Sequence, residues 1–408
     1  MKHLDSNNIL TDHQHAFRKG RSCETQLINV IDDWSKCLDK GLQVDTFVLD
    51  FEKAFDTVPH ELLKLKLHQY GVSKQVLNWI SGFLSNRTQS VVVNGSSSSK
   101  TDVVSGVPQG SVLGPILFII FINDIVKCVG SPIRLFADDC VCYRVIRSMK
   151  DCLDLQHDIT QLGKWARDWG MRFQPSKCNM VRFSKKRCNI LYDYTLEGSK
   201  LVFLDKFKYL GVNITSDLNW NYHVNSLCNK AYKTLGLLKR NLQMCPQSVK
   251  LQAYKGLIRP GLEYASAAWD PHQQYLQDSI EKVQKQAARF VTGNYSYEPG
   301  SMTNILSQLK LSSLKSRRKQ NRLILMYKAL AEITSIPRND LHKPTRSNRH
   351  NHPHSFRQLH TRSDVYKYSF VPNTIRDWNA LPSLAFNDLT IAPEQLERFT
   401  NYVRNLNF

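Results

Sequence analysis

The sequence predicts an α+β fold, in which a mixed sheet with flanking helices is followed by a helical region. The sheet is indicated by an apolar run at residues 46–49 and by residues 133–143, whose apolar character breaks at a polar pair and then resumes. Such a break is typical of two strands joined by a tight turn. The helical region is indicated by residues 224–238, where apolar side chains recur at helical spacing.

The first predicted strand leads into a polar turn and then a helix. Residues 46–49 are Thr, Phe, Val and Leu, which favour strands, and Asp50 follows them. A carboxylate there would lie at the carboxyl end of a strand, where the active sites of open sheets gather. Pro59 can open the helix that follows, because its missing N–H costs nothing in a first helical turn. Asp56 is interpreted as a turn residue or a helix cap.

The second stretch contains Asp138 and Asp139 at the expected tip of a hairpin. Carboxylate oxygens suit Mg²⁺, and a third carboxylate from a neighbouring strand would allow two ions to lie about 3.5–4 Å apart. This is the apparatus of phosphoryl transfer. Paired aspartates are also common in solvated turns, so for the pair alone an acidic hairpin tip without a function stays open.

Residues 105–115 contain three glycines and two prolines, which indicate a loop that another backbone or a ligand can approach closely. The loop is not a Walker motif, because no Gly-Lys-Ser/Thr follows it. The apolar run at residues 116–122 is shorter than the roughly 20 residues that a membrane span needs. It therefore predicts a buried core helix.

The other elements are expected along the rest of the chain. A strand within residues 89–95 runs into an Asn-Gly turn, and residues 96–100 are expected to form an exposed hairpin tip. Residues 337–363 are rich in Pro, Asn, Ser, His and Arg and are interpreted as a flexible linker. Further helices are expected at residues 24–38, 246–257, 273–293 and 313–332.

The composition favours a polyanionic partner. The formal net charge is +20 over 408 residues, and an excess of this size favours salt-dependent binding through counterion release. Much of the excess lies late in the chain, at Lys315, Arg317, Arg318, Lys319, Arg322, Lys328, Arg338, Lys343, Arg346, Arg349, Arg357 and Arg362. Aromatic residues that would permit base stacking follow at Tyr366, Tyr368, Phe370 and Trp378. A solvated basic face is the alternative interpretation.

Cysteine and histidine usage favours an intracellular chain. Ten cysteines are scattered without a Cys-x-x-Cys pair and are interpreted as reduced thiols. His350, His352, His354 and His360 cluster without nearby cysteines, which argues against a zinc knuckle. Residues 1–10 contain no signal region, and no segment could span a membrane. A soluble protein of the nucleus, the cytoplasm or both is expected, without a membrane partner.

Three blocks follow one another along the chain. Residues 49–60 are LDFEKAFDTVPH, residues 106–118 are GVPQGSVLGPILF, and residues 136–139 are FADD. Their order and spacing closely resemble the palm motifs of reverse transcriptases encoded by non-LTR (LINE-type) retrotransposons. Further segments resemble the fingers, the palm lysine segment, the primer-grip hairpin, and the thumb and following region of CR1- or Jockey-like elements: residues 14–27, 165–178, 207–212, 258–265 and 369–379.

The resemblance implies a right-hand polymerase fold with a palm of mixed sheet and flanking helices, partial fingers and a helical thumb. The implied domains are partial fingers at residues 1–45, a catalytic palm at 46–220, a helical thumb or connection at 221–335, and a basic linker with a C-terminal region at 336–408.

The resemblance also implies the catalytic residues. Asp50 and Asp138 would bridge two Mg²⁺ ions, for which Mn²⁺ is an alternative, and Asp139 would support the site. These ions would activate a primer 3′-hydroxyl and neutralise charge on the leaving pyrophosphate.

Five further residues are implied to contact the nucleotide. Phe55 would lie under the incoming sugar and reject a 2′-hydroxyl, with simple core packing as the alternative. Gln109 and Gly110 would lie near that sugar. Arg18 would clamp the triphosphate, because a guanidinium binds phosphate bidentately. Lys177 would donate a proton to pyrophosphate, with a merely solvated lysine as the alternative.

The chain departs from the family pattern at its start. It begins at the second fingers motif, so the earlier fingers strands and the family's endonuclease domain are expected to be missing, and catalysis is expected to be slow or absent. Three interpretations stay open. The first is an RNA-directed DNA polymerase whose partners are an RNA template, a DNA primer or target and dNTP. The second is a catalytically inactive nucleic-acid-binding remnant. The third is a two-metal nuclease, which would need neither Phe55 nor the loop at residues 105–115.

Overall fold

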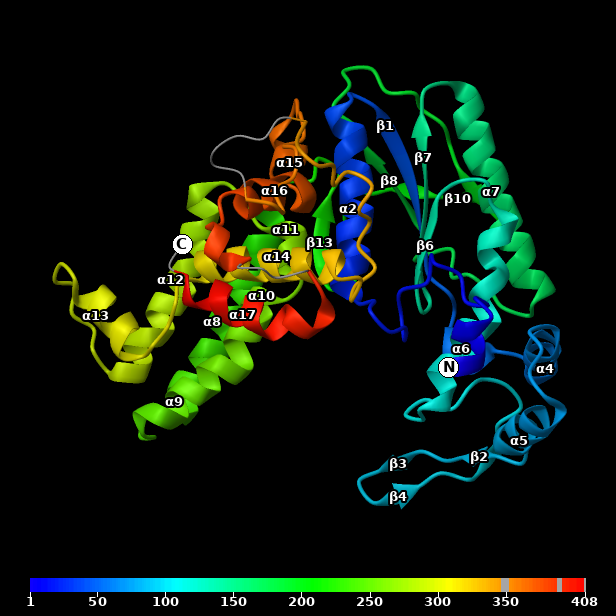
Figure 1. The fold of residues 1–408 in the computed structure, drawn as a ribbon. Coiled ribbons are helices and arrows are strands. Elements are labelled where there is room, and N and C mark those ends of the chain that lie inside the picture. The colour runs from blue at the N-terminus through cyan, green and yellow to red at the C-terminus, as the bar shows by residue number, and fades with distance from the viewer. Residues whose placement is uncertain (346–351, 387–390, 407–408) are drawn as a thin grey trace. The chain divides into compact units, whose positions relative to one another are not determined.

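The computed structural model describes residues 1–345, 352–386 and 391–406. The chain divides into two compact units. Unit 1 comprises residues 1–23 and 42–205, and unit 2 comprises residues 24–41 and 206–408. Unit 1 is built on a mixed sheet with helices, and unit 2 is mainly helical (Figure 1). The predicted α+β class is confirmed.

Unit 1 contains a five-stranded sheet with the order β11-β8-β1-β7-β6. Its strands are β1 (Gln43–Leu49), β6 (Ile133–Phe136), β7 (Asp139–Ile146), β8 (Asn179–Phe183) and β11 (Val202–Phe203). Strand β1 pairs antiparallel with both β7 and β8, whereas β11 lies parallel to β8. Because β1 has a neighbour on each side, nearly all of its residues are buried.

Helices pack against this sheet and against one another. Helix α7 (Met149–Asp168) contacts β7 (Figure 1) and begins at a capping box between Ser148 and Asp151. Helix α6 (Leu113–Ile122) is buried along most of its length, which confirms the predicted core helix. Helix α4 (His60–Gln69) follows Pro59, as predicted, and contacts both α6 and α5 (Lys74–Leu84). The shorter helices are α1 (Lys2–Ser6), α3 (Ala54–Thr57) and η1 (Asn123–Cys128).

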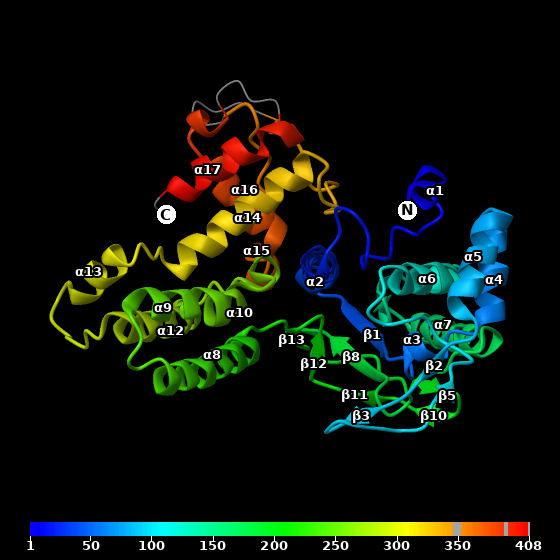
Figure 2. The same ribbon diagram turned by 90° about the horizontal axis from the view of Figure 1, so that it is seen from below.

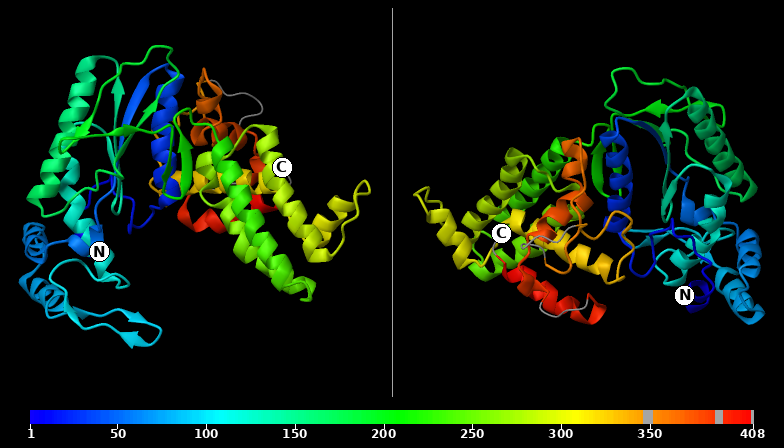
Figure 3. Two further views of the ribbon diagram at one scale, coloured as in Figure 1. Left: turned by 180° about the vertical axis from the view of Figure 1, so that it is seen from behind. Right: turned by 45° about the horizontal axis from the view of Figure 1, so that its top comes forward.

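A hairpin arm at residues 85–105 projects from the rest of unit 1 (Figure 3). Its short strands pair as β2 (Thr88–Gln89) with β5 (Thr101–Asp102) and as β3 (Val92–Val93) with β4 (Ser96–Ser97). The predicted Asn-Gly turn is confirmed, because Asn94 and Gly95 have φ of 50° and 84°. The tip is this turn. The serines that were expected at the tip instead pair back onto β3. Another small hairpin is formed by β9 (Thr195–Leu196) and β10 (Ser199–Lys200).

A buried ion pair lies in the middle of β1. Asp45 is fully buried and accepts two hydrogen bonds from Arg182, at 2.9 and 3.0 Å. Its carboxylate also accepts hydrogen bonds from Tyr194 Oη at 3.1 Å and Gln43 Nε2 at 3.0 Å. The charge of Asp45 is therefore fully compensated within the protein.

Unit 2 consists of helices and one hairpin. The hairpin pairs β12 (Lys206–Tyr209) with β13 (Val212–Thr215). Helices α8, α9, α10 and α12 lie together (Figure 2), and α14 contacts both α16 and α17. The helices predicted at residues 24–38, 246–257, 273–293 and 313–332 are confirmed to within a few residues. The helices of unit 2 are α2 (Cys23–Asp39, of which Cys23 falls in unit 1), α8 (Asn221–Asn241), α9 (Gln247–Ala253), η2 (Tyr254–Ile258), α10 (Arg259–Glu263), α11 (Ser266–Trp269), α12 (Gln274–Thr292), α13 (Ser301–Gln308), α14 (Leu314–Leu330), α15 (Asp364–Lys367), α16 (Phe370–Asn379), η3 (Ser383–Ala385), η4 (Pro393–Gln395) and α17 (Leu396–Asn405).

Several residues expected to face nucleic acid belong to the core of unit 2. Phe370 and Trp378 are buried, so neither offers a ring for base stacking. Arg318 is fully buried and donates to Asp270 at 2.7 Å. Arg322 is also buried and pairs with Asp377. These basic residues do not form one surface, because Arg318 and Arg322 of α14 point into the core, where each pairs with an aspartate.

The predicted linker is partly folded. His352 is buried and its ring stacks on Phe386 with centroids 4.3 Å apart. Trp378 Nε1 donates to the carbonyl of His354 at 2.9 Å. The linker prediction is therefore wrong for this part of the segment, because the histidines serve as packing residues. Three residues named above lie outside the described residues: Arg346, Arg349 and His350.

Two further expectations concern the whole chain. Each cysteine is a free thiol in the structure. In the described parts of the chain, no helix combines the length and apolar character that crossing a membrane requires.

Candidate active site

The β6–β7 hairpin carries two of the candidate carboxylates at its tip. Phe136 pairs with Asp139, so the turn contains only Ala137 and Asp138. Ala137 has φ of 52°, a left-handed conformation of the kind that two-residue hairpin turns require. The predicted strand, turn and strand are confirmed. Asp138 lies in the turn, and Asp139 follows it as the first residue of β7.

The sheet register brings Asp50 to the same place. Leu49 of β1 lies opposite Cys140 of β7. Continuing this register by one residue places Asp50 opposite Asp139, and opposite residues of an antiparallel pair share a face. The three aspartates therefore lie near one another, where β1 ends and the β6–β7 hairpin turns.

The backbone of Asp50 is held from the side of β8. Gln174 N–H donates to the carbonyl of Asp50 at 2.9 Å. The backbone N–H of Asp50 donates to Cys178 Sγ at 3.4 Å, and Cys178 is buried. No sequence motif identifies Cys178, because a thiol that accepts a backbone hydrogen bond has no pattern of its own.

Excess negative charge collects at the three carboxylates. Burial, together with the charges of Asp138 and Asp50, raises the pKa of Asp139 to about 6. Burial and the charge of Asp50 also raise the pKa of Asp138. Lys177 Nζ lies 3.8 Å from Asp50 Oδ1, but the Lys177 side chain is 59% exposed, so the attraction is screened by water. Lys177 and Asp50 therefore form a loose ion pair, and proton donation by Lys177 stays a prediction.

The carboxylates suit a hard divalent cation. Among the residues that the structure describes, no group of three His, Cys, Asp or Glu side chains is arranged closely enough to hold a metal ion as it stands. The donors near the hairpin are nevertheless all carboxylate oxygens, and Lys177, the cation that pairs with Asp50, is largely exposed. Both properties fit Mg²⁺ or Mn²⁺.

The glycine-rich loop at residues 105–114 folds tightly onto α3. Gly106 has φ of 90°, and a Cβ there would lie 2.7 Å from the Asp56 backbone, so only glycine fits. A Cβ at Gly114 would collide with the carbonyl of Pro108. Ser111 Oγ closes the turn by accepting a hydrogen bond from Gly114 N–H at 2.9 Å. The close backbone approach predicted for this loop is confirmed at Gly106 and Gly114.

The middle of the loop presents Gln109 and Gly110. Gln109 is exposed, and its Nε2 donates to Asp56 Oδ1 at 2.8 Å. Asp56 therefore orients Gln109, a role that the interpretation as a turn or cap residue missed. Gly110 has φ of 81°, and no other atom of the described chain lies within 4 Å of its Cβ position. Its surroundings are open.

Phe55 lies between the core and the surface. Its ring stacks on Phe118 with centroids 4.3 Å apart, and its carbonyl accepts a hydrogen bond from Val107 at 2.7 Å. The side chain is half-buried, so part of the ring stays accessible to a ligand. A pocket of about 520 Å³ adjoins α3 and the loop, and Lys53, Arg87 and Gln109 are among its lining residues.

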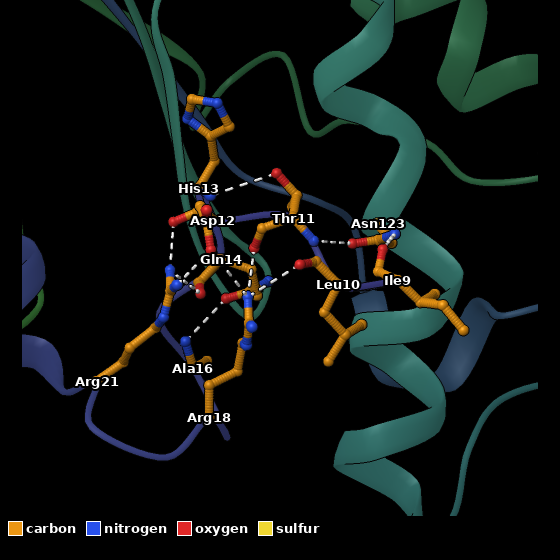
Figure 4. Close-up of polar contacts among 10 residues, drawn as sticks. All are labelled: Ile9, Leu10, Thr11, Asp12, His13, Gln14, Ala16, Arg18, Arg21 and Asn123. Carbon is orange, nitrogen blue, oxygen red and sulfur yellow. Dashed lines mark hydrogen bonds and ion pairs between the residues drawn. The ribbon is translucent and has the colours of Figure 1, made fainter. Parts of the chain in front are cut away.

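Arg18 belongs to a hydrogen-bonded N-terminal segment (Figure 4). Its Nη1 donates to the carbonyls of Leu10 at 3.1 Å and Thr11 at 2.6 Å, and its side chain is only 15% exposed. Burial lowers its pKa. Arg21 pairs with Asp12 in the same segment, at 2.6 Å. Arg18 thus folds this segment, and its role at a triphosphate stays a prediction.

Gln14 is a contact of the site that the sequence did not reveal. Its Oε1 accepts a hydrogen bond from the N–H of Ala137 in the hairpin turn, at 3.0 Å. Gln14 lies within a segment that carries the family resemblance, but no property of the sequence distinguishes a buried glutamine that holds a turn.

Comparison with known proteins gives a consistent result. Residues 1–214 match the family described as "Reverse transcriptase (RNA-dependent DNA polymerase)". A probable RNA-directed DNA polymerase from transposon X-element of Drosophila melanogaster is 31% identical over 301 residues, which cover 71% of this chain and 33% of that protein. The RNA-directed DNA polymerase from mobile element jockey of Drosophila funebris is 28% identical over 319 residues, which cover 72% and 34%. The chain spans about a third of the length of these relatives.

Solved telomerase structures show a weaker likeness. The apo telomerase of Candida tropicalis has a TM-score of 0.43 and 10% identity, with 82% of this chain and 58% of that chain covered. The Candida albicans telomerase in complex with a TWJ fragment of telomeric RNA has a TM-score of 0.44 and 11% identity, with 100% and 56% covered.

Proposed function

The chain belongs to the reverse transcriptase (RNA-dependent DNA polymerase) family, and from this premise we propose that it adds deoxynucleotides to a primer 3′-hydroxyl on an RNA template. The resemblance to polymerases of Jockey-like mobile elements is confirmed by the relatives above. The observation that carries the proposal is the proximity of Asp50, Asp138 and Asp139 at one end of the sheet, where three carboxylates face one loosely paired cation, Lys177.

We propose that Asp50 and Asp138 hold two Mg²⁺ ions, with Mn²⁺ as an alternative, and that Asp139 supports the site. When bound, these ions supply activation of the primer 3′-hydroxyl and neutralisation of the charge on pyrophosphate. The hairpin turn and the β1–β7 register keep the carboxylates in place before any ligand arrives. Such preorganisation is what electrostatic catalysis needs.

The loop and α3 supply the proposed nucleotide contacts. The partly exposed ring of Phe55 is proposed to lie under the incoming sugar, where its bulk excludes a 2′-hydroxyl. Gln109, oriented by Asp56, and the open surface at Gly110 are proposed to face that sugar. Lys53 and Arg87 line the adjoining pocket together with Asp56 and Asp102, and the two cationic side chains are proposed as contacts for an anionic ligand.

Two basic residues have proposed roles in handling phosphate. Lys177 is largely exposed beside Asp50, which leaves it free to move toward a leaving pyrophosphate and protonate it. Arg18 would clamp the triphosphate with the donors that it does not use in the N-terminal segment, since only Nη1 is engaged by the carbonyls of Leu10 and Thr11.

The domain assignment is also a proposal. We assign partial fingers to residues 1–45, the palm to 46–220, the thumb or connection to 221–335 and a basic C-terminal region to 336–408. Unit 1 contains the sheet, and the boundary between unit 1 and unit 2 lies near residue 205. This boundary supports the end of a palm domain in this part of the chain. Helix α2 clusters with unit 2, so the fingers segment is divided between the units.

Primer extension on poly(rA)/oligo(dT) with Mg²⁺ tests the proposal. We expect the wild-type chain to extend the primer, and the double variant Asp138→Ala and Asp139→Ala to lose extension. RNA affinity, measured by fluorescence anisotropy, should stay equal or rise slightly, because two negative charges are lost. Asp193→Ala is the matched control, since Asp193 is exposed and pairs only with Lys200 among the described residues.

Two results would contradict the proposal. Extension that survives the double replacement would remove both aspartates from the active site. RNA binding by the wild type without any extension would identify a nucleic-acid-binding remnant, the second interpretation that the sequence left open.

A further inference from the structure

The N-terminal segment forms an extra edge on the sheet beside the carboxylate hairpin. Leu135 N–H of β6 donates to the carbonyl of His13, and His15 N–H donates to the carbonyl of Leu135, both at 2.9 Å. Gln14 lies between these two bonds in a parallel bridge with Leu135. The segment at residues 13–16 is therefore fixed to the strand that leads into the Asp138 turn.

The side chain of Gln14 links this segment to the turn itself. Its Oε1 accepts hydrogen bonds from Ala16 N–H at 2.9 Å and from Ala137 N–H at 3.0 Å. Both donors are backbone amides, so the atom between them must be the oxygen of the amide group. Gln14 is 1% exposed, which means that water cannot replace it.

Ala137 needs this acceptor. It is the first residue of the two-residue turn, it is buried, and it has the left-handed φ of 52°, which is unfavourable for a residue with a Cβ. A buried N–H without a partner adds a further penalty. Without Gln14, the turn would lose its partner and would relax toward other conformations, which would move the adjacent Asp138.

A neutral side chain also suits this position. Nε2 of Gln14 has no hydrogen-bond partner among the described residues, so the amide nitrogen contributes no bond. A glutamate would offer the same acceptor but would bring a fourth negative charge to three carboxylates that already repel one another. The glutamine supplies the oxygen without the charge.

We propose that Gln14 is a positioning residue that sets the conformation of the Ala137-Asp138 turn and thereby the placement of Asp138 and Asp139 for divalent cation binding. The inference rests on the proposed function for its catalytic consequence. Its structural part, the control of the turn by Gln14, is independent of that function. Residues that orient metal ligands typically affect metal affinity or activity by about 10- to 100-fold.

Asn123 provides a matched control. Its Oδ1 accepts from Thr11 N–H and its Nδ2 donates to the carbonyl of Ile9, both at 2.7 Å. It therefore anchors the same N-terminal segment by two hydrogen bonds (Figure 4), and these bonds reach Ile9 and Thr11 instead of the hairpin turn. Gln14→Met and Asn123→Leu each keep the side-chain size while removing the amide.

The experiment compares these variants in the full chain by three measurements: hydrogen exchange of peptides covering residues 133–143, Mn²⁺ affinity by titration calorimetry, and primer extension. Gln14→Met is expected to speed exchange at the turn, to weaken Mn²⁺ binding by about 10- to 100-fold and to lower kcat by a similar factor. Asn123→Leu is expected to lower the melting temperature as much as Gln14→Met does. It should leave hydrogen exchange at the turn, Mn²⁺ affinity and kcat unchanged. Gln14→Glu, which keeps the acceptor, is expected to restore protection of the turn.

The outcomes separate the two proposals. Equal exchange and equal Mn²⁺ affinity in Gln14→Met and Asn123→Leu would overturn the positioning role while leaving the polymerase proposal intact. A wild-type chain that neither binds Mn²⁺ nor extends a primer would overturn the polymerase proposal, and the exchange comparison would still decide whether Gln14 controls the turn.

Discussion

Strand β1 carries two aspartates in opposite surroundings. Asp45 is fully buried and neutralised by a bidentate bond with Arg182 and two further donors. Asp50, at the end of the strand, has a side chain that is 43% exposed, and Lys177 lies 3.8 Å away. Its other neighbours are carboxylates. A compensated charge maintains a fold, whereas an uncompensated charge at a strand end marks a place where a ligand supplies the missing charge.

The largest difference between the two aspartates is expected in activity. Asp50→Asn should reduce primer extension by at least about a thousandfold, because losing a metal ligand removes several kcal/mol of transition-state stabilisation. The melting temperature should stay the same or rise, because a repelling charge disappears. Steady-state extension and thermal unfolding of the same preparation measure both. Near-normal extension by the variant would exclude Asp50 as a metal ligand.

The reverse pattern is expected for Asp45→Asn. The change leaves Arg182 buried without its counter-charge, and removing one partner of a buried ion pair costs about 3–5 kcal/mol. Denaturant unfolding should show this loss, while extension per folded molecule should remain close to that of the wild type. A variant as stable as the wild type would show that the pair does not hold the sheet together.

The smallest effect is expected for Asp139→Asn without divalent cations. The folded-state pKa of Asp139 is raised from 3.8 to about 6, so the folded chain binds this proton more tightly than the unfolded chain does. The contribution of this proton to the free energy of unfolding of the wild type is therefore lost as the pH rises from about 4 to about 6. At pH 7 the variant should be more stable by at most about 1 kcal/mol, because the Asp139 side chain, although partly desolvated by its neighbours, still contacts water that screens its charge.

Thermal unfolding at pH 4 and pH 7 measures this difference. The advantage of Asp139→Asn should be largely lost at pH 4, where Asp139 is protonated in the folded wild type and in about half of the unfolded chains. Added Mg²⁺ should stabilise the wild type at pH 7 more than the variant. A stabilisation that is larger at pH 4 than at pH 7 would contradict the raised pKa.

The elements that the sequence predicted are those that depend on residues close together along the chain. The hairpin at Asp138 and the buried helix α6 follow from short-range patterns of apolar and polar side chains. The capping box of Ser148 and Asp151 at the start of α7 is equally local, since its two residues lie three positions apart. Gln14 lies 123 residues from Ala137, and no local pattern records such a contact.

Charge was the property that the sequence predicted least well. The basic residues late in the chain were treated as one surface, but Arg318 and Arg322 face inward and pair with acidic residues of α16 and the segment after α11. Asp56 was treated as a cap, although its carboxylate orients Gln109. In both cases the role of a charged side chain depends on a partner that only the fold brings near.

The register that places Asp50 opposite Asp139 also governs which changes of length this chain tolerates. Successive residues of a strand point to opposite faces, so inserting one residue between Asp139 and Cys140 in β7 would turn the carboxylate of Asp139 away from Asp50. Substitutions in the same strand would leave the register unchanged. The exposed tip of the arm at residues 91–98 carries no such constraint, and loops of this kind accept insertions, whereas Arg87 at the base of the arm lines the pocket beside α3. Insertions and deletions should therefore be tolerated at the tip of the arm, and selection should remove them from the strands that carry the three aspartates.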